Sequence, residues 1–181
     1  MKKYHIILPV VMILCFMIGC QDKEAMAELE AMKTQAEVEE QNKDVVRRYF
    51  VEVDKGDVES IFALVDEIYA PDCIAHSATS EEQGIDAVKE HITFAFGTFG
   101  EMQHDIEEMI AEGDMVSVRC TFKATHKGDF MGVPATGKPL SCPGLYMFRI
   151  EEGRIQEDWI DWDSLLSLTM QLDMELKPKE E

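Results

Sequence analysis

The sequence predicts an α+β fold in which three N-terminal helices pack on a curved, mostly antiparallel sheet, making a cone with one internal cavity. Three observations predict it. Apolar residues recur at helical spacing between residues 42 and 96, and they alternate with polar residues after residue 100. The chain has 181 residues, enough for one domain with a buried core. Helices followed by a meander of long strands are typical of an α+β domain.

The composition narrows the classes of partner. The net charge is −19, with 46% hydrophobic and 29% charged residues, as in an ordinary globular protein. A charge this negative repels phosphate backbones, so we expect no nucleic-acid partner.

The first residues predict a targeting signal. Lys2 and Lys3 precede an apolar run over residues 6–18 that is too short to span a bilayer, which is typical of a secretory signal peptide over residues 1–19. The end of this run, residues 17–20, resembles a bacterial lipobox. The resemblance implies that Cys20 is lipidated and that the protein is an extracytoplasmic, membrane-anchored lipoprotein of the cell envelope. The alternatives are an ordinary secretory signal and an uncleaved anchor.

Residues 20–41 are rich in Glu, Ala, Met, Lys and Gln, and predict a helical or flexible tether. We expect the α+β domain over residues 42–174 and a charged tail over residues 175–181. Within the domain, the apolar spacing predicts helices over residues 42–54, 58–69 and 84–96, with a short strand over residues 73–76.

Strict alternation predicts two hairpins in the second half of the domain. Residues 102–111 pair with residues 115–126, and residues 140–150 pair with residues 154–162. A two-residue turn at Glu152 and Gly153 would set Tyr146 opposite Trp159. A three-residue loop would instead set Leu145 there and bring Arg149 onto the inward face, and the sequence leaves both registers open.

The last strand carries the candidate chemistry, because acidic residues share a parity with Ile155 and Trp159: Glu157, Asp161 and Asp163. If this parity faces the cavity, a buried carboxylate with a raised pKa becomes a candidate general acid or base. If Ile160 and Trp162 face inward instead, the carboxylates form a solvated face. Asp163 also has the position of a helix N-cap.

Histidine and cysteine spacings favour neither a metal nor a cofactor. His76, His104 and His126 are the histidines that can meet in a cavity, and His126 continues the inward parity of its strand. The sequence holds no HExxH, HxH, CxxC or dinucleotide fingerprint, so we expect no metal and no cofactor. Cys73, Cys120 and Cys142 are expected to include buried thiols.

Three segments together resemble one known family. Residues 125–138 are similar to the loop signature of the SnoaL-like polyketide cyclases, or ester cyclases, of the nuclear-transport-factor-2-like superfamily. Residues 153–159 with Asp163, Gln171 and Leu172 resemble its C-terminal pattern, and residues 69–72 with His76 resemble its first-strand pattern. The resemblance covers residues 42–174.

The resemblance implies ring closure by intramolecular aldol condensation, without metal or cofactor, with an aspartate at the end of the last strand as acid/base. The matching residue is Asp163, with Asp161 as the fallback. The positions matching the family's cavity are His126, His76, Glu157 and Trp159. The chain departs from the family at Ile160, where an acidic residue is common, and at Asp173, where glycine is usual.

The sequence therefore predicts a cyclase, isomerase or hydrolase that acts on a small apolar carbonyl compound. The predicted catalytic residues are Asp163, Asp161 and His126, and the predicted substrate-binding residues are His76, Glu157, Trp159, Tyr146 and Arg149. Two alternatives remain open: a non-catalytic module that binds a small apolar molecule, and a module that forms homodimers through the open face of the sheet, as this superfold often does.

Overall fold

The computed structural model describes residues 4–77, 80–162 and 168–173. The chain divides into two compact units, residues 1–38 and residues 39–181, and each is described by itself. The first unit is helical from Tyr4 onward, as part of helix α1 (Tyr4–Asp54). Over the residues that the structure describes, no helix is both long enough and apolar enough to cross a membrane.

The helices of the second unit end close to the predicted positions, while α1 continues through residues 20–41, where a helical or flexible tether was predicted. Gly56, just after the end of α1, has a φ of +77°, a left-handed conformation that glycine adopts without strain. Asp57 then caps α2 (Val58–Ile68), since its Oδ1 accepts a hydrogen bond from the backbone N–H of Glu59 at 3.2 Å. Helix α3 (Ile85–Thr98) follows Gly84, and the short α4 (Thr169–Gln171) lies near the C-terminus.

Six strands form one sheet in the order β2-β1-β6-β5-β4-β3. The strands are β1 (Tyr69–His76), β2 (Glu81–Gln83), β3 (Phe99–Glu112), β4 (Met115–His126), β5 (Pro139–Glu151) and β6 (Arg154–Trp162). Neighbouring strands are antiparallel except β1 and β6, which are parallel. The predicted α+β class is confirmed, with a mixed sheet that does not close into a barrel.

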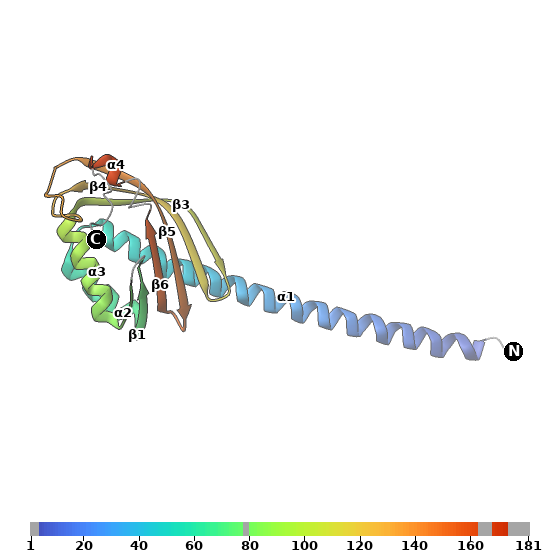
Figure 1. Ribbon diagram of the computed structural model, residues 1–181. Coiled ribbons are helices and arrows are strands. Elements are labelled where there is room, and N and C mark those ends of the chain that lie inside the picture. Colours follow the sequence, from blue (N-terminus) through green and yellow to red (C-terminus); the bar gives the residue numbers. More distant parts are fainter. Residues whose placement is uncertain (1–3, 78–79, 163–167, 174–181) are drawn as a thin grey trace, which may run out of the picture. The chain divides into compact units, whose positions relative to one another are not determined.

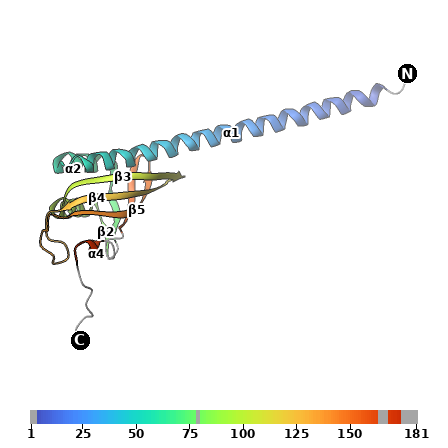
Figure 2. The same cartoon turned by 90° about the horizontal axis from the view of Figure 1, so that it is seen from above.

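The helices of the second unit cover one face of the sheet, which we call the inner face (Figures 1 and 2). From α1, Phe50 packs edge-on against Tyr146 and Phe148 of β5. The strict alternation of β4 places its buried side chains here: Val116, Val118, Cys120, Phe122, Ala124 and His126. The opposite side is the outer face, where Arg119 and Lys123 of β4 are exposed.

A bulge in β6 changes which of its side chains face inward. Ile150 of β5 pairs with Ile155, but Arg149 pairs with Glu157, so Gln156 is an additional residue in β6. Ile155 and Asp158 are therefore both buried, although they differ in parity. A strand with one extra residue reverses every side chain beyond it.

The differences from the predicted elements come from pairing between distant residues. The structure has β1 beginning at Tyr69 rather than at residue 73, because Tyr69 pairs with Ile155 of β6. The polar loop after residue 76 contains β2, which pairs with β1. The bounds of β4 and β6 are as predicted.

The three cysteines of the domain are buried thiols, as expected. Burial raises the pKa of Cys73 to about 11 and the pKa of Cys120 to about 12. Thiols with such pKa values are poor nucleophiles at neutral pH, so these two side chains act as small core residues.

Candidate active site

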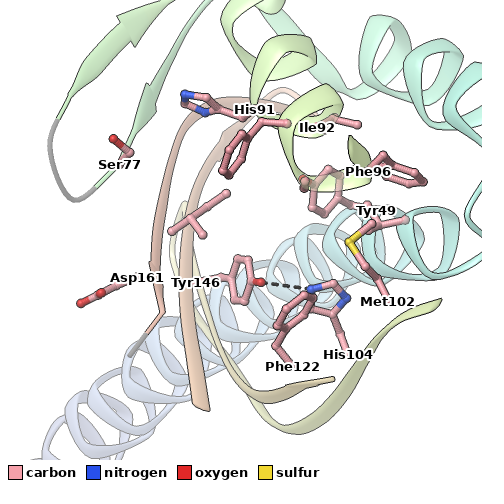
Figure 3. Close-up of a pocket in the computed structure, with 14 residues that line it drawn as sticks. Tyr49, Ser77, His91, Ile92, Phe96, Met102, His104, Phe122, Tyr146 and Asp161 are labelled. Carbon is pink, nitrogen blue, oxygen red and sulfur yellow. Dashed lines mark hydrogen bonds between the residues drawn. The ribbon is translucent and has the colours of Figure 1, made fainter. Parts of the chain in front are cut away.

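A cavity of about 240 Å³ lies on the inner face, between helices α1 and α3 and strands β3 to β6 (Figure 3). Its wall is mainly apolar, with Val53, Ile92, Phe96, Met102, Phe122 and Ile160 among the lining residues. None of the described residues that line it is lysine or arginine. Apolar walls with a few polar groups are typical of sites for small, mainly apolar molecules.

Three polar side chains from three elements form a hydrogen-bonded group at this cavity, which we call the inner triad: Asp54, His104 and Tyr146. Asp54 is the last residue of α1, His104 lies in β3, and Tyr146 lies in β5. The Nδ1 atom of His104 is 2.6 Å from Oδ1 of Asp54, and its Nε2 atom is 3.1 Å from the Tyr146 hydroxyl (Figure 3). His104 and Tyr146 both line the cavity.

The partners of His104 fix its tautomer. A carboxylate only accepts hydrogen bonds, so Nδ1 of His104 carries a hydrogen and donates it to Asp54. The backbone N–H of His104 donates to the other oxygen of Asp54 at 3.0 Å, which holds that carboxylate in place. Nε2 then accepts from the Tyr146 hydroxyl when the imidazole is neutral, and donates to it when the imidazole is protonated.

Aromatic rings enclose the inner triad. The ring of Phe50 lies 5.1 Å from the His104 ring and 5.0 Å from the Tyr146 ring, measured between centroids. The ring of Phe122 lies 5.2 Å from His104. The side chain of His104 is only 5% exposed. Such packing limits rotation of the imidazole and excludes water, which strengthens its hydrogen bonds.

Other polar residues of the cavity wall lie away from the inner triad. Figure 3 shows Ser77 and His91 on the far side of the cavity from His104. Asp161 of β6 also lines the cavity, but its side chain is exposed and is directed away from Tyr146 (Figure 3).

Asp163, a predicted catalytic residue, lies outside the described residues, and so does the side chain of Cys20, the predicted lipidation site. His126 of β4 is fully buried on the inner face and is not among the residues that line the cavity. Its Nδ1 atom lies 3.0 Å from the Thr136 hydroxyl, while its Nε2 atom has no hydrogen-bond partner among the described residues.

Of the predicted substrate-binding residues, only Tyr146 lines the cavity. The other four lie together on the outer face, and we call them the outer cluster: His76, Arg149, Glu157 and Trp159. The imidazole of His76 stacks on the Trp159 ring at 4.7 Å between centroids, and the Arg149 guanidinium lies 5.7 Å from the same ring. The Glu157 carboxylate accepts a hydrogen bond from the Arg149 guanidinium at 2.5 Å, and its other oxygen lies 3.2 Å from Nε2 of His76.

The bulge at Gln156 accounts for this placement. The turn at Glu152 and Gly153 has two residues, and Glu151 pairs with Arg154. The extra residue then shifts the pairing, so Tyr146 faces Ile160 and Met147 faces Trp159. Neither predicted register is observed. The inward parity beyond the bulge belongs to Asp158 and Ile160, so Glu157 and Trp159 face outward.

Two acidic residues on the cavity side of the sheet were not predicted as site residues: Asp54 of α1 and Asp158 of β6. Asp158 is 2% exposed, and burial raises its pKa to about 6, although a hydrogen bond from the Tyr69 hydroxyl at 2.8 Å opposes the rise. Nothing in the sequence marks the bulge that turns Asp158 inward. Asp54 had the pattern of an ordinary helix end, and its contact with His104 joins residues 50 positions apart.

The comparisons with known proteins agree with this fold, an α+β cone with a mainly apolar cavity on the inner face of its sheet. The family model of the SnoaL-like polyketide cyclases matches residues 43–172. The aklanonic acid methyl ester cyclase DnrD of Streptomyces peucetius is 29% identical over 132 residues, which cover 71% of this chain and 88% of that protein. The cyclase DauD of Streptomyces sp. (strain C5) is also 29% identical over 132 residues, with 80% of it covered.

Solved structures share the fold. A protein assigned as a SnoaL-like polyketide cyclase from Jannaschia sp. CCS1 superposes with a TM-score of 0.68 at 24% identity, covering 72% of this chain and 91% of that chain. TsrD from Streptomyces laurentii superposes with a TM-score of 0.63 at 24% identity, covering 73% and 94%.

The chain belongs to the SnoaL-like polyketide cyclase family. Family membership supports a cofactor-independent, cyclase-like function.

Proposed function

We propose that the protein is a lipid-anchored, extracytoplasmic enzyme that removes a proton next to the carbonyl group of a small apolar compound, without a metal or cofactor. The reaction would be a cyclisation or an isomerisation; in a hydrolysis, the same base would instead take a proton from the attacking water. The observation that carries this proposal is an apolar cavity lined by Tyr146 and His104, in which the Tyr146 hydroxyl is hydrogen-bonded to the histidine.

The chemistry follows from where charge develops. Removing a proton next to a carbonyl places negative charge on the carbonyl oxygen, and a hydroxyl donor in a water-poor cavity stabilises that charge. We assign the proton-accepting carboxylate to Asp163, from its place in the family motif, with Asp161 as the second choice. His126 is the third candidate for the group that accepts the proton, as an inner-face histidine whose Nε2 atom has no hydrogen-bond partner among the described residues.

The charge of the cavity wall selects among substrates. Because none of the described lining residues is lysine or arginine, a substrate carboxylate or phosphate would lack a permanently charged counter-ion. An uncharged ketone or ester fits better. The two curated relatives are named as cyclases of a methyl ester, which is consistent with an uncharged substrate.

Exchange of α-protons with solvent deuterium tests the proposal before the natural substrate is known. The full-length protein is mixed with 2-tetralone in D2O, and loss of the α-proton signals is followed by NMR. We expect catalysed exchange that is lost in Asp163→Asn and kept in Asp161→Asn, which changes the second-choice base; the reverse result would assign the base to Asp161. Absence of exchange in the wild type with aromatic ketones and esters would contradict the enzymatic proposal, and exchange unaffected by Asp163→Asn would contradict the assigned base.

The same experiment distinguishes an enzyme from a non-catalytic binding module. Ligand binding to the cavity without any proton exchange would favour it over an enzyme.

The anchor on Cys20 is supported by the lipobox-like residues 17–20. Mass spectrometry of the protein from bacterial membranes would detect diacylglycerol on an N-terminal Cys20. The Cys20→Ala variant is expected to lose the lipid and to leave the membrane fraction, and an unlipidated wild-type N-terminus would refute the anchor.

Homodimerisation through the outer face is supported by large apolar side chains exposed there. Ile110 is 62% exposed, Leu145 47% and Met147 38%. If this face pairs, sedimentation velocity should show a dimer for the wild type and a monomer for Met147→Glu. A monomeric wild type at high concentration would remove this proposal.

A further inference from the structure

Tyr146 and Phe148 provide a comparison within one strand. Both side chains are buried on the inner face of β5, and their rings stack in parallel at 6.4 Å between centroids. Both also pack against Phe50 of α1. An aromatic ring without a hydroxyl therefore fits this environment. What distinguishes Tyr146 is its hydroxyl, which bonds to His104 at the cavity.

His104 is oriented by hydrogen bonds as well as by packing. Asp54 accepts both from its ring and from its backbone N–H, so the carboxylate sets the position and the tautomer of the imidazole together. The described titratable groups hydrogen-bonded to His104 are Asp54 from α1 and Tyr146 from β5, while Phe50 and Phe122 supply apolar surfaces. A carboxylate behind an imidazole stabilises the imidazolium form when a proton is taken up.

From this geometry we infer that the inner triad is a proton relay serving an oxygen atom of the ligand in the cavity. Tyr146 is the catalytic residue that meets the ligand, while His104 and Asp54 are positioning residues that act through it. The inference rests on the proposed function and deepens it, because it assigns the partner of the substrate oxygen within this chain.

The proton movements balance without any further reactant. As a base removes the α-proton of the substrate, the Tyr146 hydroxyl gives its proton to the carbonyl oxygen, and protonated His104 returns one from Nε2 to Tyr146. The substrate is then an enol, the base holds the α-proton, and His104 is neutral. When the base returns its proton to carbon, or the enol attacks a second carbonyl, the enol proton travels back through Tyr146 to His104.

A single isosteric substitution, Asp54→Asn, should change which ring nitrogen of His104 carries the hydrogen. In Asp54→Asn, the side-chain oxygen can still accept from the backbone N–H of His104, which leaves the amide NH2 facing Nδ1. An NH2 group donates, so Nδ1 must become the acceptor and the ring hydrogen moves to Nε2. The change keeps the size of the side chain and removes the carboxylate that stabilises the imidazolium.

The first test is nitrogen NMR of histidine in the full-length protein. At a pH where His104 is neutral, we expect the hydrogen on Nδ1 in the wild type and on Nε2 in Asp54→Asn. A wild-type His104 with its hydrogen on Nε2, or an unchanged tautomer in Asp54→Asn, would overturn the relay.

The second test measures how much the Tyr146 hydroxyl contributes to ligand binding, with two probes of similar shape, 4-nitrophenol and nitrobenzene. Nitrophenol has a phenolic oxygen that can form a hydrogen bond with Tyr146, and nitrobenzene has no phenolic oxygen. We expect Tyr146→Phe to weaken nitrophenol binding about tenfold, the size of one hydrogen bond to a charged group, and to change nitrobenzene binding less than about twofold. Equal effects on both probes, or no effect on either, would contradict the relay.

The two proposals can fail separately. Tyr146-dependent nitrophenol binding with no proton exchange on any carbonyl compound would refute the proposed enzymatic function and leave Tyr146 only as the hydrogen-bond partner of the ligand oxygen. Proton exchange that is insensitive to Tyr146→Phe would refute the relay and leave the function.

Discussion

The inner triad and the outer cluster contain the same kinds of side chain on opposite faces of one sheet. Each has a histidine bonded to a carboxylate and packed against aromatic rings, His104 with Asp54 on one side and His76 with Glu157 on the other. They differ in surroundings. The His104 side chain is 5% exposed beside an apolar cavity, whereas His76 is 19% exposed and Glu157 also bonds to Arg149.

Residue types alone therefore do not identify a site. Hydrogen bonds strengthen where water is excluded, while exposed ion pairs contribute about 0–1 kcal/mol. The same imidazole and carboxylate can therefore move protons on the inner face and only help to order strand neighbours on the outer face.

Removing the Tyr146 hydroxyl should have the largest effect. Tyr146→Phe is expected to slow α-proton exchange of 2-tetralone by about 10²–10³-fold, the range for losing a positioned acid or base, with little change in KM. Trp159→Phe in the outer cluster is the matched control and should change the rate less than about threefold. A larger loss in Trp159→Phe than in Tyr146→Phe would reverse the roles that we assign to the two faces.

Asp158 should control the pH dependence of stability. Its pKa is raised from 3.8 to about 6 in the folded protein, so the folded state binds more protons between these values. The free energy of unfolding should therefore contain a contribution that is present at low pH and lost as the pH rises through about 6. That contribution amounts to about 3 kcal/mol for a shift of this size.

Denaturant unfolding from pH 4.5 to pH 7.5 measures this contribution. The stability of Asp158→Asn relative to the wild type should increase as the pH rises, whereas Asp161→Asn, at an exposed position, should keep a constant difference. A constant difference for Asp158→Asn as well would show that Asp158 keeps an ordinary pKa.

Asp54→Asn should slow proton exchange about tenfold, because the relay keeps its hydroxyl but loses the carboxylate that stabilises protonated His104. The tautomer of His104, read by nitrogen NMR, should change together with the rate, and a purely structural role for Asp54 would leave that tautomer unchanged. Glu157→Gln makes the same chemical change in the outer cluster and should leave both the rate and the His104 tautomer unchanged.

The smallest effect is expected for His76→Gln. The outer cluster is partly exposed, so losing the His76 contacts should change the free energy of unfolding by less than about 1 kcal/mol and leave proton exchange unaffected. Thermal unfolding and the exchange assay check both parts. A loss of exchange in this variant would bring the outer cluster into the site.

The fold could be predicted from the sequence because its signals are local. Alternation along residues 115–126 gave the bounds and the inner face of β4, and Lys55, Gly56 and Asp57 marked the end of α1. The motif segments gave the family. These signals depend on side-chain periodicity and on turn residues, which are written into neighbouring positions.

The site could be predicted only in part, because its geometry depends on pairing between distant residues. Tyr146 and His104 were named as cavity candidates, and both line the cavity. The bulge at Gln156 has no sequence signal, so Asp158 was missed and Trp159 was given a cavity position. Asp54 joins the site only because α1 crosses β3, a contact that no local pattern contains.

Locating a bound ligand tests the central claim most directly. A crystal of the full-length protein with 4-bromophenol would place the bromine by its anomalous scattering and thereby orient the phenol oxygen. We expect one ligand in the inner-face cavity with its oxygen at hydrogen-bond distance from the Tyr146 hydroxyl. A ligand bound on the outer face beside Trp159, or one in the cavity with its oxygen turned away from Tyr146, would contradict it.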